Sequence, residues 1–188
     1  MLRFIRKRKT LQFLIFGGLS ALFILWGVSG TLARGRAAIA GRIFGRNVSL
    51  RAFQEQELRV VRHIRQRTPE AELSPELIEG HTWLRLLLLE EVRRQRLTIP
   101  DTEVVETIQQ MPFFQREGQF DFDRYQQYLA FQHLSPRQFE EETREWLLIT
   151  RLRTQVLTDV AADAVEAQWQ AYLTDLLQQA DIQSSVSE

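Results

Sequence analysis

The sequence predicts an all-α protein, in which an N-terminal transmembrane helix precedes a helical domain with room for one short pair of β-strands. Two observations support this class: a long apolar run near the N-terminus, and three serines that each precede a helical pattern. Ser49, Ser74 and Ser135 are N-cap candidates, because a serine hydroxyl accepts a hydrogen bond from a free N–H of the first helical turn. The last two are followed by proline at the first helical position, where a missing N–H costs nothing.

The apolar run from Leu11 to Val28 has the length of a membrane anchor. As a helix it spans roughly 27 Å, close to the ~30 Å hydrocarbon layer of a bilayer. It is longer than the apolar part of a cleavable signal peptide, the main alternative. Basic residues crowd its N-terminal side, so we expect a cytoplasmic end at 1–9, an anchor at 10–29 and everything after it outside the cytoplasm. A Gly/Ala/Arg linker at 30–41 and a helical domain at 42–188 complete the expected organisation.

Apolar periodicity predicts six helices after the linker. We place them at about residues 50–67, 75–96, 102–110, 122–132, 136–159 and 163–179. The second contains Trp83–Leu89, which is apolar over too wide an arc for a surface helix, so it should cross the middle of the core. The fifth should bury one stripe, formed by Phe139, Trp146, Ile149, Val156 and Val160.

Residues 38–44 are expected to form a short strand, with a turn at 45–47. A strand needs a pairing partner to be stable. We expect that partner within residues 180–186, for which disorder is the alternative.

Composition and motifs argue against a catalytic or metal centre. The chain has no cysteine, which excludes disulfides, Cys-ligated metals and thiol catalysis. His63, His81 and His133 lie on separate predicted helices without a metal-ligand spacing, so we expect them at the surface or at packing contacts. We therefore expect no metal, no cofactor and no catalytic residue.

The charged residues predict no polyanion partner. The formal net charge is zero, and the arginines of 59–67 and 93–96 are not gathered in the sequence with aromatic residues that could stack on bases. The adjacent acids at 90–91 and 140–142 are expected on solvated helix faces. Nucleic-acid binding is therefore not expected.

A loop rich in aromatic residues, PFFQREGQFDFDRY at 112–125, joins the third and fourth predicted helices. Pro112 should end the helix before it, Gly118 can take a positive φ in a polar turn, and Asp121 is placed to cap the next helix. We expect the aromatic side chains to fill the seam between helices rather than to form a ligand pocket.

The order of these features resembles the N-terminal chaperone domain of the PpiD and SurA family of periplasmic folding factors. The matching residues are Pro112, Phe114, Gln115, Gly118, Phe120, Asp121, Tyr125, Leu129, Ser135, Pro136, Phe139 and Glu140. Upstream, Gly45 and Ser49 fall in a segment similar to the family's Val-Asn-Gly-x-x-Ile-Ser motif, with Phe44 in place of asparagine. The likeness covers about residues 38–180.

This resemblance, with the PpiD-like anchor, implies a non-catalytic holdase chaperone in the bacterial inner membrane, with its helical domain in the periplasm. Its implied partners are unfolded or newly translocated polypeptides, the bilayer through residues 10–29, and the secretion channel. Phe113 and Phe131 are the candidate client-binding residues. We carry over no residue of a parvulin isomerase module and expect no isomerase activity. The alternatives are the front part of a longer peptidyl-prolyl isomerase and an accessory subunit of the secretion channel.

Overall fold

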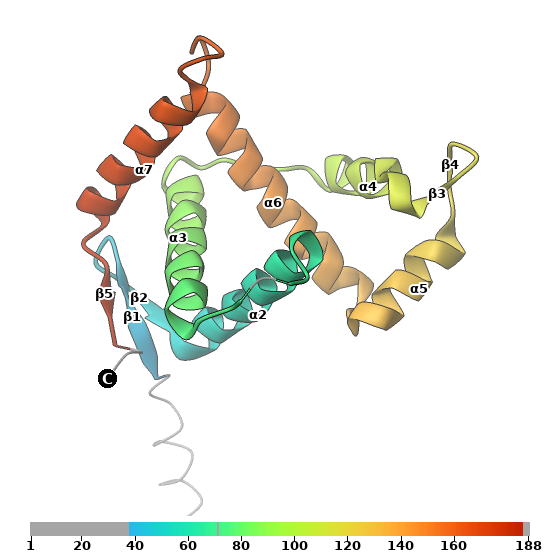
Figure 1. The fold of residues 1–188 in the computed structure, drawn as a ribbon, viewed down its shortest axis with the longest axis horizontal. Coiled ribbons are helices and arrows are strands. Elements are labelled where there is room, and N and C mark those ends of the chain that lie inside the picture. Colours follow the sequence, from blue (N-terminus) through green and yellow to red (C-terminus); the bar gives the residue numbers. More distant parts are fainter. Residues whose placement is uncertain (1–37, 71, 186–188) are drawn as a thin grey trace, which may run out of the picture. The chain divides into compact units, whose positions relative to one another are not determined.

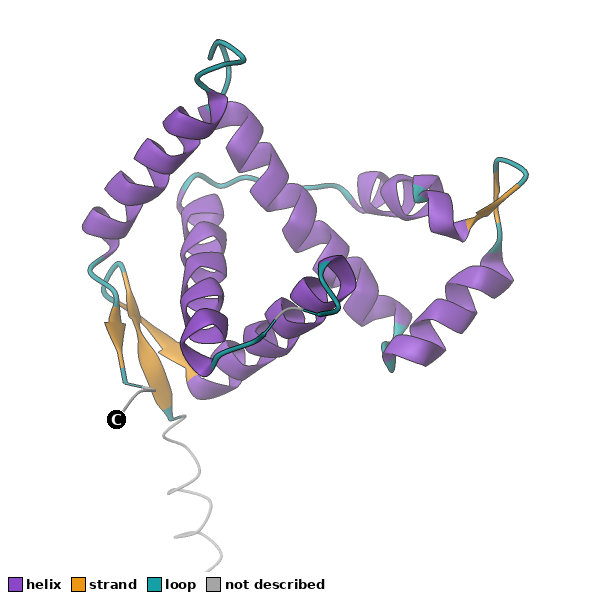
Figure 2. Ribbon diagram, viewed as in Figure 1, coloured by secondary structure: helices purple, strands orange, loops and turns teal. Residues whose placement is uncertain are grey.

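The computed structural model describes residues 38–70 and 72–185, which form helices and two small sheets (Figure 1, Figure 2). The elements are β1 (Ile39–Ile43), β2 (Arg46–Ser49), α2 (Leu50–Arg67), α3 (Pro75–Arg94), α4 (Asp101–Gln110), the 3₁₀ turn η1 (Pro112–Phe114), β3 (Gln115–Arg116), β4 (Gln119–Phe120), α5 (Phe122–Gln132), α6 (Pro136–Val156), α7 (Val165–Ala180) and β5 (Gln183–Ser184). The expected anchor at 10–29 lies outside the described residues. Within the described ranges, none of the helices combines the length and the apolar character of a membrane span.

The predicted helix starts are confirmed by their caps. The hydroxyls of Ser49, Ser74 and Ser135 accept hydrogen bonds from the backbone N–H three residues on, at 3.2, 3.2 and 3.3 Å. At Ser135 the Gln138 side chain also accepts from the serine N–H, which completes a capping box. These local bonds fix where α2, α3 and α6 begin.

The first sheet has three strands in the order β2-β1-β5, all antiparallel, rather than the single pair expected. The predicted partner within 180–186 is confirmed as β5. The predicted turn at 45–47 is wrong, because the turn lies at Phe44 and Gly45, with φ of 48° and 72°. Positive φ at both central residues matches the right-handed twist of the strands, so the chain re-enters the sheet already at Arg46.

Phe44 occupies the turn position where the family motif has asparagine. A bulky side chain at positive φ is disfavoured. Here the Arg94 guanidinium lies 4.1 Å from the centre of the Phe44 ring, and the ring also packs against the buried residues of the sheet side. These contacts offset the unfavourable backbone conformation.

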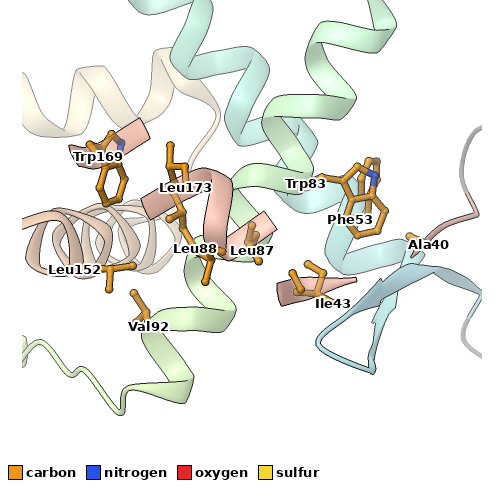
Figure 3. Packing of buried hydrophobic residues seen from close by; sticks show 12 residues of the cluster. Ala40, Ile43, Phe53, Trp83, Leu87, Leu88, Val92, Leu152, Trp169 and Leu173 are labelled. Atoms are coloured by element: carbon orange, nitrogen blue, oxygen red, sulfur yellow. The ribbon is translucent and has the colours of Figure 1, made fainter. Parts of the chain in front are cut away.

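Helix α3 lies among α2, α6, α7 and the three-stranded sheet (Figure 1). Around it is the larger of two buried clusters, here called the sheet-side core (Figure 3). Its members are Ala40, Ile43, Phe53, Trp83, Leu87, Leu88, Val92, Leu152, Trp169, Leu173, Leu176 and Ala180. Leu87 is fully buried, so the prediction that this helix crosses the core is confirmed.

The second cluster, here called the aromatic core, is formed by α4, η1, α5 and the first half of α6. Its members are Ile99, Val104, Ile108, Phe114, Tyr125, Leu129 and Phe139. Phe114 is fully buried, with Tyr125 and Phe139 edge-on to it at ring-centre distances of 5.2 and 5.7 Å. The expectation that the aromatic loop fills a seam between helices is therefore confirmed for Phe114.

Helix α6 differs from the prediction at its end and in its buried face. It ends at Val156 rather than near 159, and Asp159 takes a φ of 65°, so Val160 is not helical. Trp146, predicted to be buried, is 46% exposed, whereas Thr143 and Leu152 are buried. Together with the half-buried Leu148, which packs against both cores, these residues form a face with four- and five-residue steps, and Trp146 lies beside that face.

Candidate functional site

A groove lies between α2, α3 and α6. It consists of two adjoining cavities of about 270 and 690 Å³ that share Arg59, His63, Arg85 and Trp146. The smaller cavity reaches Phe113 beside the aromatic core, and the larger one extends to residues of α7. The larger volume falls within the range of binding pockets in proteins.

Ion pairs tie the three helices together beside this groove. We define the Arg–Glu network as Arg59 and Arg62 of α2, Arg85 of α3, and Glu142 and Glu145 of α6. The Glu145 carboxylate lies 2.6 Å from a nitrogen of Arg59 as an ion pair and accepts a hydrogen bond from Arg85 at 2.9 Å. Glu142 lies 2.6 Å from the nearest Arg62 nitrogen. All five side chains are between 14 and 25% exposed, so their charges are only partly screened by water.

The side-chain amide of Gln56 joins two members of the Arg–Glu network by hydrogen bonds. Its nitrogen donates to Glu145 at 3.1 Å, and its oxygen accepts from Arg85 at 2.7 Å. Because Gln56 is 7% exposed, these bonds satisfy a buried polar group. The amide therefore fixes the relative positions of α2, α3 and α6 at the groove.

These contacts correct two expectations about charged residues. The acids at 90–91 and 140–142 are not all solvated: Glu142 belongs to the network, and Glu91 is 8% exposed. Arg59 and Arg62, which looked isolated from aromatic residues in the sequence, meet Trp146 and Phe113 at the smaller cavity. The long-range approach of α6 to α2 creates both environments.

The lining of the larger cavity is cationic and apolar. It includes four arginines and two histidines, and no acidic side chain among the described residues: Arg59, Arg67, Arg85, Arg153, His63 and His81. Partial burial, together with the charges of Arg67 and Arg85, lowers the pKa of His63 below its usual 6.5. The neutral form of His63 is therefore favoured more than in a fully solvated histidine.

The apolar part of the lining includes two tryptophans. Trp146 is shared by both cavities, and the larger cavity is also lined by Trp169 of α7, Leu84 and Ile149. At the smaller cavity Phe113 is 52% exposed, although its ring packs 4.1 Å from that of Phe114 and 5.4 Å from that of Tyr128. One side of the Phe113 ring packs against these two rings, and its other side is exposed to solvent.

Comparison with known families assigns the chain to one of them. Over residues 1–153 the chain matches the family model described as the SurA-like N-terminal domain. The chain belongs to this family. Membership indicates a chaperone-type role, and the match spans α2, α3 and nearly all of α6, the helices that form the groove. No curated protein and no solved structure matches the chain.

The motif residues of the SurA-like domain have structural roles, in the aromatic core, in turns and at helix ends. Phe114, Tyr125, Leu129 and Phe139 lie in the aromatic core, with Phe120 half-buried against it. Gly45 and Gly118 take positive φ in turns, and Pro112 opens η1 directly after α4 and its C-cap residue. Ser49 and Asp121 cap helices, and the Asp121 carboxylate accepts from the N–H groups of Asp123 and Arg124.

The two candidate client-binding residues lie in different places in the SurA-like domain. Phe113 lines the smaller cavity, whereas Phe131 is 81% exposed on α5 and lines neither cavity. His63 and His81 line the larger cavity, while His133 is the left-handed C-cap of α5. In the ranges 38–70 and 72–185 no group of three His, Asp or Glu side chains is placed to hold a metal.

Sequence reasoning missed most of the groove. The sequence predicts Trp146 in the buried stripe of its helix, and nothing in it marks Arg85 or Glu145 as parts of a site. The available signal was the composition of α6, where Glu142, Glu145 and Trp146 lie on neighbouring faces of one helix. Which residues of α2 and α3 would meet them depends on tertiary packing.

Proposed function

We propose that this SurA-like domain is the client-binding part of a membrane-anchored, non-catalytic holdase that faces the periplasm. Its clients would be unfolded or newly translocated polypeptides, held in the groove between α2, α3 and α6. The observation that carries this proposal is the half-exposed pair Trp146 and Phe113 at a groove of binding-pocket size. Unfolded chains expose apolar side chains, and covering them yields about 25 cal/mol per Å² of apolar surface.

The groove suits reversible binding without chemistry. Its side chains include aromatic rings, guanidinium groups and an amide, which can bind an extended polypeptide through apolar contacts and hydrogen bonds. The Arg–Glu network keeps the three helices in place, so the site is preorganised and little ordering entropy is lost on binding. Because less entropy is lost on binding, a client can be bound with useful affinity even where the contact area is modest.

The proposed membrane layout rests on the sequence of the first 29 residues. A basic end followed by an apolar run of membrane-spanning length supports an inner-membrane anchor of the PpiD type, close to the secretion channel. A reporter enzyme fused after Glu188 should be active only outside the cytoplasm. Activity of the reporter in the cytoplasm would overturn this layout.

An aggregation assay tests the holdase proposal. The full-length chain, inserted in lipid nanodiscs, should suppress aggregation of a denatured outer-membrane β-barrel protein at a few-fold molar excess, with empty nanodiscs as the control. Trp146→Ser should weaken suppression, and Phe131→Ser, at an exposed aromatic residue outside the groove, should leave it unchanged. Equal losses in both variants would place the client surface elsewhere. A proline-limited refolding assay alongside should show no gain in rate.

A further inference from the structure

We propose that the groove selects client segments in which a carboxylate lies next to aromatic or aliphatic side chains. This inference rests on the proposed holdase function and specifies its substrate class. It follows from the unequal distribution of charge along the groove, since the apolar lining alone would bind any exposed hydrophobic segment.

The Arg–Glu network leaves positive charge in excess beside the groove. Its three arginines face two glutamates, so the network carries one net positive charge. In the larger cavity Arg67 and Arg153 add two more, and among the described residues Arg67 has no acidic partner. Arg153 meets Glu166 at 3.4 Å, but both side chains are about half exposed or more, so this pair is weak and exchangeable.

The cations lie beside the apolar lining rather than apart from it. Arg67 and Arg85 line the same cavity as Trp146 and Ile149. The charges of Arg67 and Arg85 also contribute, after burial, to the lowered pKa of His63. A client carboxylate bound here would gain ion pairs with the arginines while the client's neighbouring apolar side chains cover the tryptophan.

The same charges favour an acidic peptide over a nucleic acid. Binding to a phosphate backbone requires a track of several unpaired cations. In the groove Glu142 and Glu145 neutralise most of the charge of Arg59, Arg62 and Arg85, which leaves too few free cations for such a track. One or two carboxylates of an extended peptide match the remaining charge.

Fluorescence anisotropy with the full-length chain tests this selection. Three labelled apolar peptides containing tryptophan and leucine would differ at one position only, which is Glu, Gln or Lys. The Glu peptide should bind about three- to five-fold more tightly than the Gln peptide, the size expected of exposed ion pairs, and the Lys peptide most weakly. The advantage of the Glu peptide should shrink as salt concentration rises.

Two variants separate the groove cations from surface charge in general. Arg67→Gln combined with Arg153→Gln should remove most of the difference between the Glu and Gln peptides. Arg137→Gln, at an exposed residue of α6 outside both cavities, is the matched control and should keep the difference. As an independent readout, the Glu peptide should raise the pKa of His63 in an NMR titration, because a nearby anion stabilises the imidazolium.

The outcomes distinguish this inference from the proposed function. Equal binding of all three peptides would overturn the carboxylate selection and leave the holdase proposal intact. Failure of every peptide to bind would overturn both. Tighter binding of a single-stranded oligonucleotide than of the Glu peptide would also overturn the inference, because it would show that the groove is a polyanion site.

Discussion

Gly41 lies where strand β1, strand β5 and helix α3 approach one another most closely. A Cβ atom there would lie 2.1 Å from the Gln183 carbonyl oxygen and 2.7 Å from Cη2 of Trp83. The carbonyl is backbone and cannot rotate away, so Gly41→Ala should displace β5 and cost about 1–3 kcal/mol of the free energy of unfolding. Urea denaturation of the variant and the wild type would measure this loss.

Gly80 provides the matched control for Gly41. It lies within α3, and a Cβ atom there would meet nothing within 4 Å. Gly80→Ala should therefore stabilise the protein by up to about 1 kcal/mol, because alanine loses less backbone entropy on helix formation. Similar effects of both substitutions would contradict the close approach at Gly41.

His63 makes stability depend on pH in a definite direction. Its folded pKa is lowered from 6.5 by partial burial and by the charges of Arg67 and Arg85, so below that pH the unfolded state binds protons more readily than the folded one. Stability should fall as pH decreases through 6.5 toward the folded pKa, and His63→Gln should lessen this fall. Thermal unfolding between neutral and mildly acidic pH would measure it.

A second variant tests the cause of the His63 shift. Arg67→Gln removes one of the two cations but keeps the partial burial and Arg85, so it should remove only part of the pH dependence. A wild-type slope retained in both variants would show that His63 does not determine this behaviour.

At the scale of single elements, the sequence predicted helix starts better than helix ends. The starts at Ser49, Ser74 and Ser135 carry a side-chain signal that acts within one turn. The misplaced ends of α3 and α6 are followed by left-handed residues, Arg96 and Asp159, with φ of 57° and 65°. Glycine usually marks such positions, and neither residue type predicts a left-handed conformation by itself.

The groove could not be predicted in the same way, because its parts are distant in sequence. Gln56 and Glu145 are 89 residues apart, and Arg62 and Glu142 are 80 apart. The apolar periodicity identifies α6 as amphipathic. It does not distinguish the helix face that packs against the two cores from the neighbouring face, which carries Trp146. Only the packing of α6 against the other helices decides this.

The Arg–Glu network should stabilise the contact between α2, α3 and α6. Glu145→Gln removes the carboxylate that faces both Arg59 and Arg85 and leaves two partly buried cations poorly paired. We expect a loss of about 2 kcal/mol, between the values for exposed and fully buried pairs. Guanidinium would screen the network, so urea is the appropriate denaturant for this measurement.

The exposed pair of Arg51 and Glu55 on α2 is the control for this prediction. Its side chains are 89 and 53% exposed, so Glu55→Gln should cost less than about 0.5 kcal/mol. If Glu145→Gln cost no more than Glu55→Gln, the network would hold the groove helices no more firmly than surface charges do.

At the scale of the domain, α6 belongs to both cores. Its Phe139 lies in the aromatic core and its Leu152 in the sheet-side core, while Leu148 packs against both clusters. A continuous helix transmits the loss of packing at one end to the other, because unfolding either half exposes the shared residues. The two cores should therefore unfold in one transition, although the groove lies open between the helices that connect them.

Phe114→Ala tests this coupling, because Phe114 is fully buried in the aromatic core, far along the chain from the tryptophans of the sheet-side core. In a Trp26→Phe background, fluorescence reports Trp83, Trp146 and Trp169, none of which belongs to the aromatic core. The substitution should cost about 3–5 kcal/mol and should shift the fluorescence and far-UV circular dichroism midpoints together. Phe131→Ala, on an exposed side chain, should shift neither. A loss of helical signal that preceded an unchanged fluorescence transition would show that α4 and α5 unfold on their own.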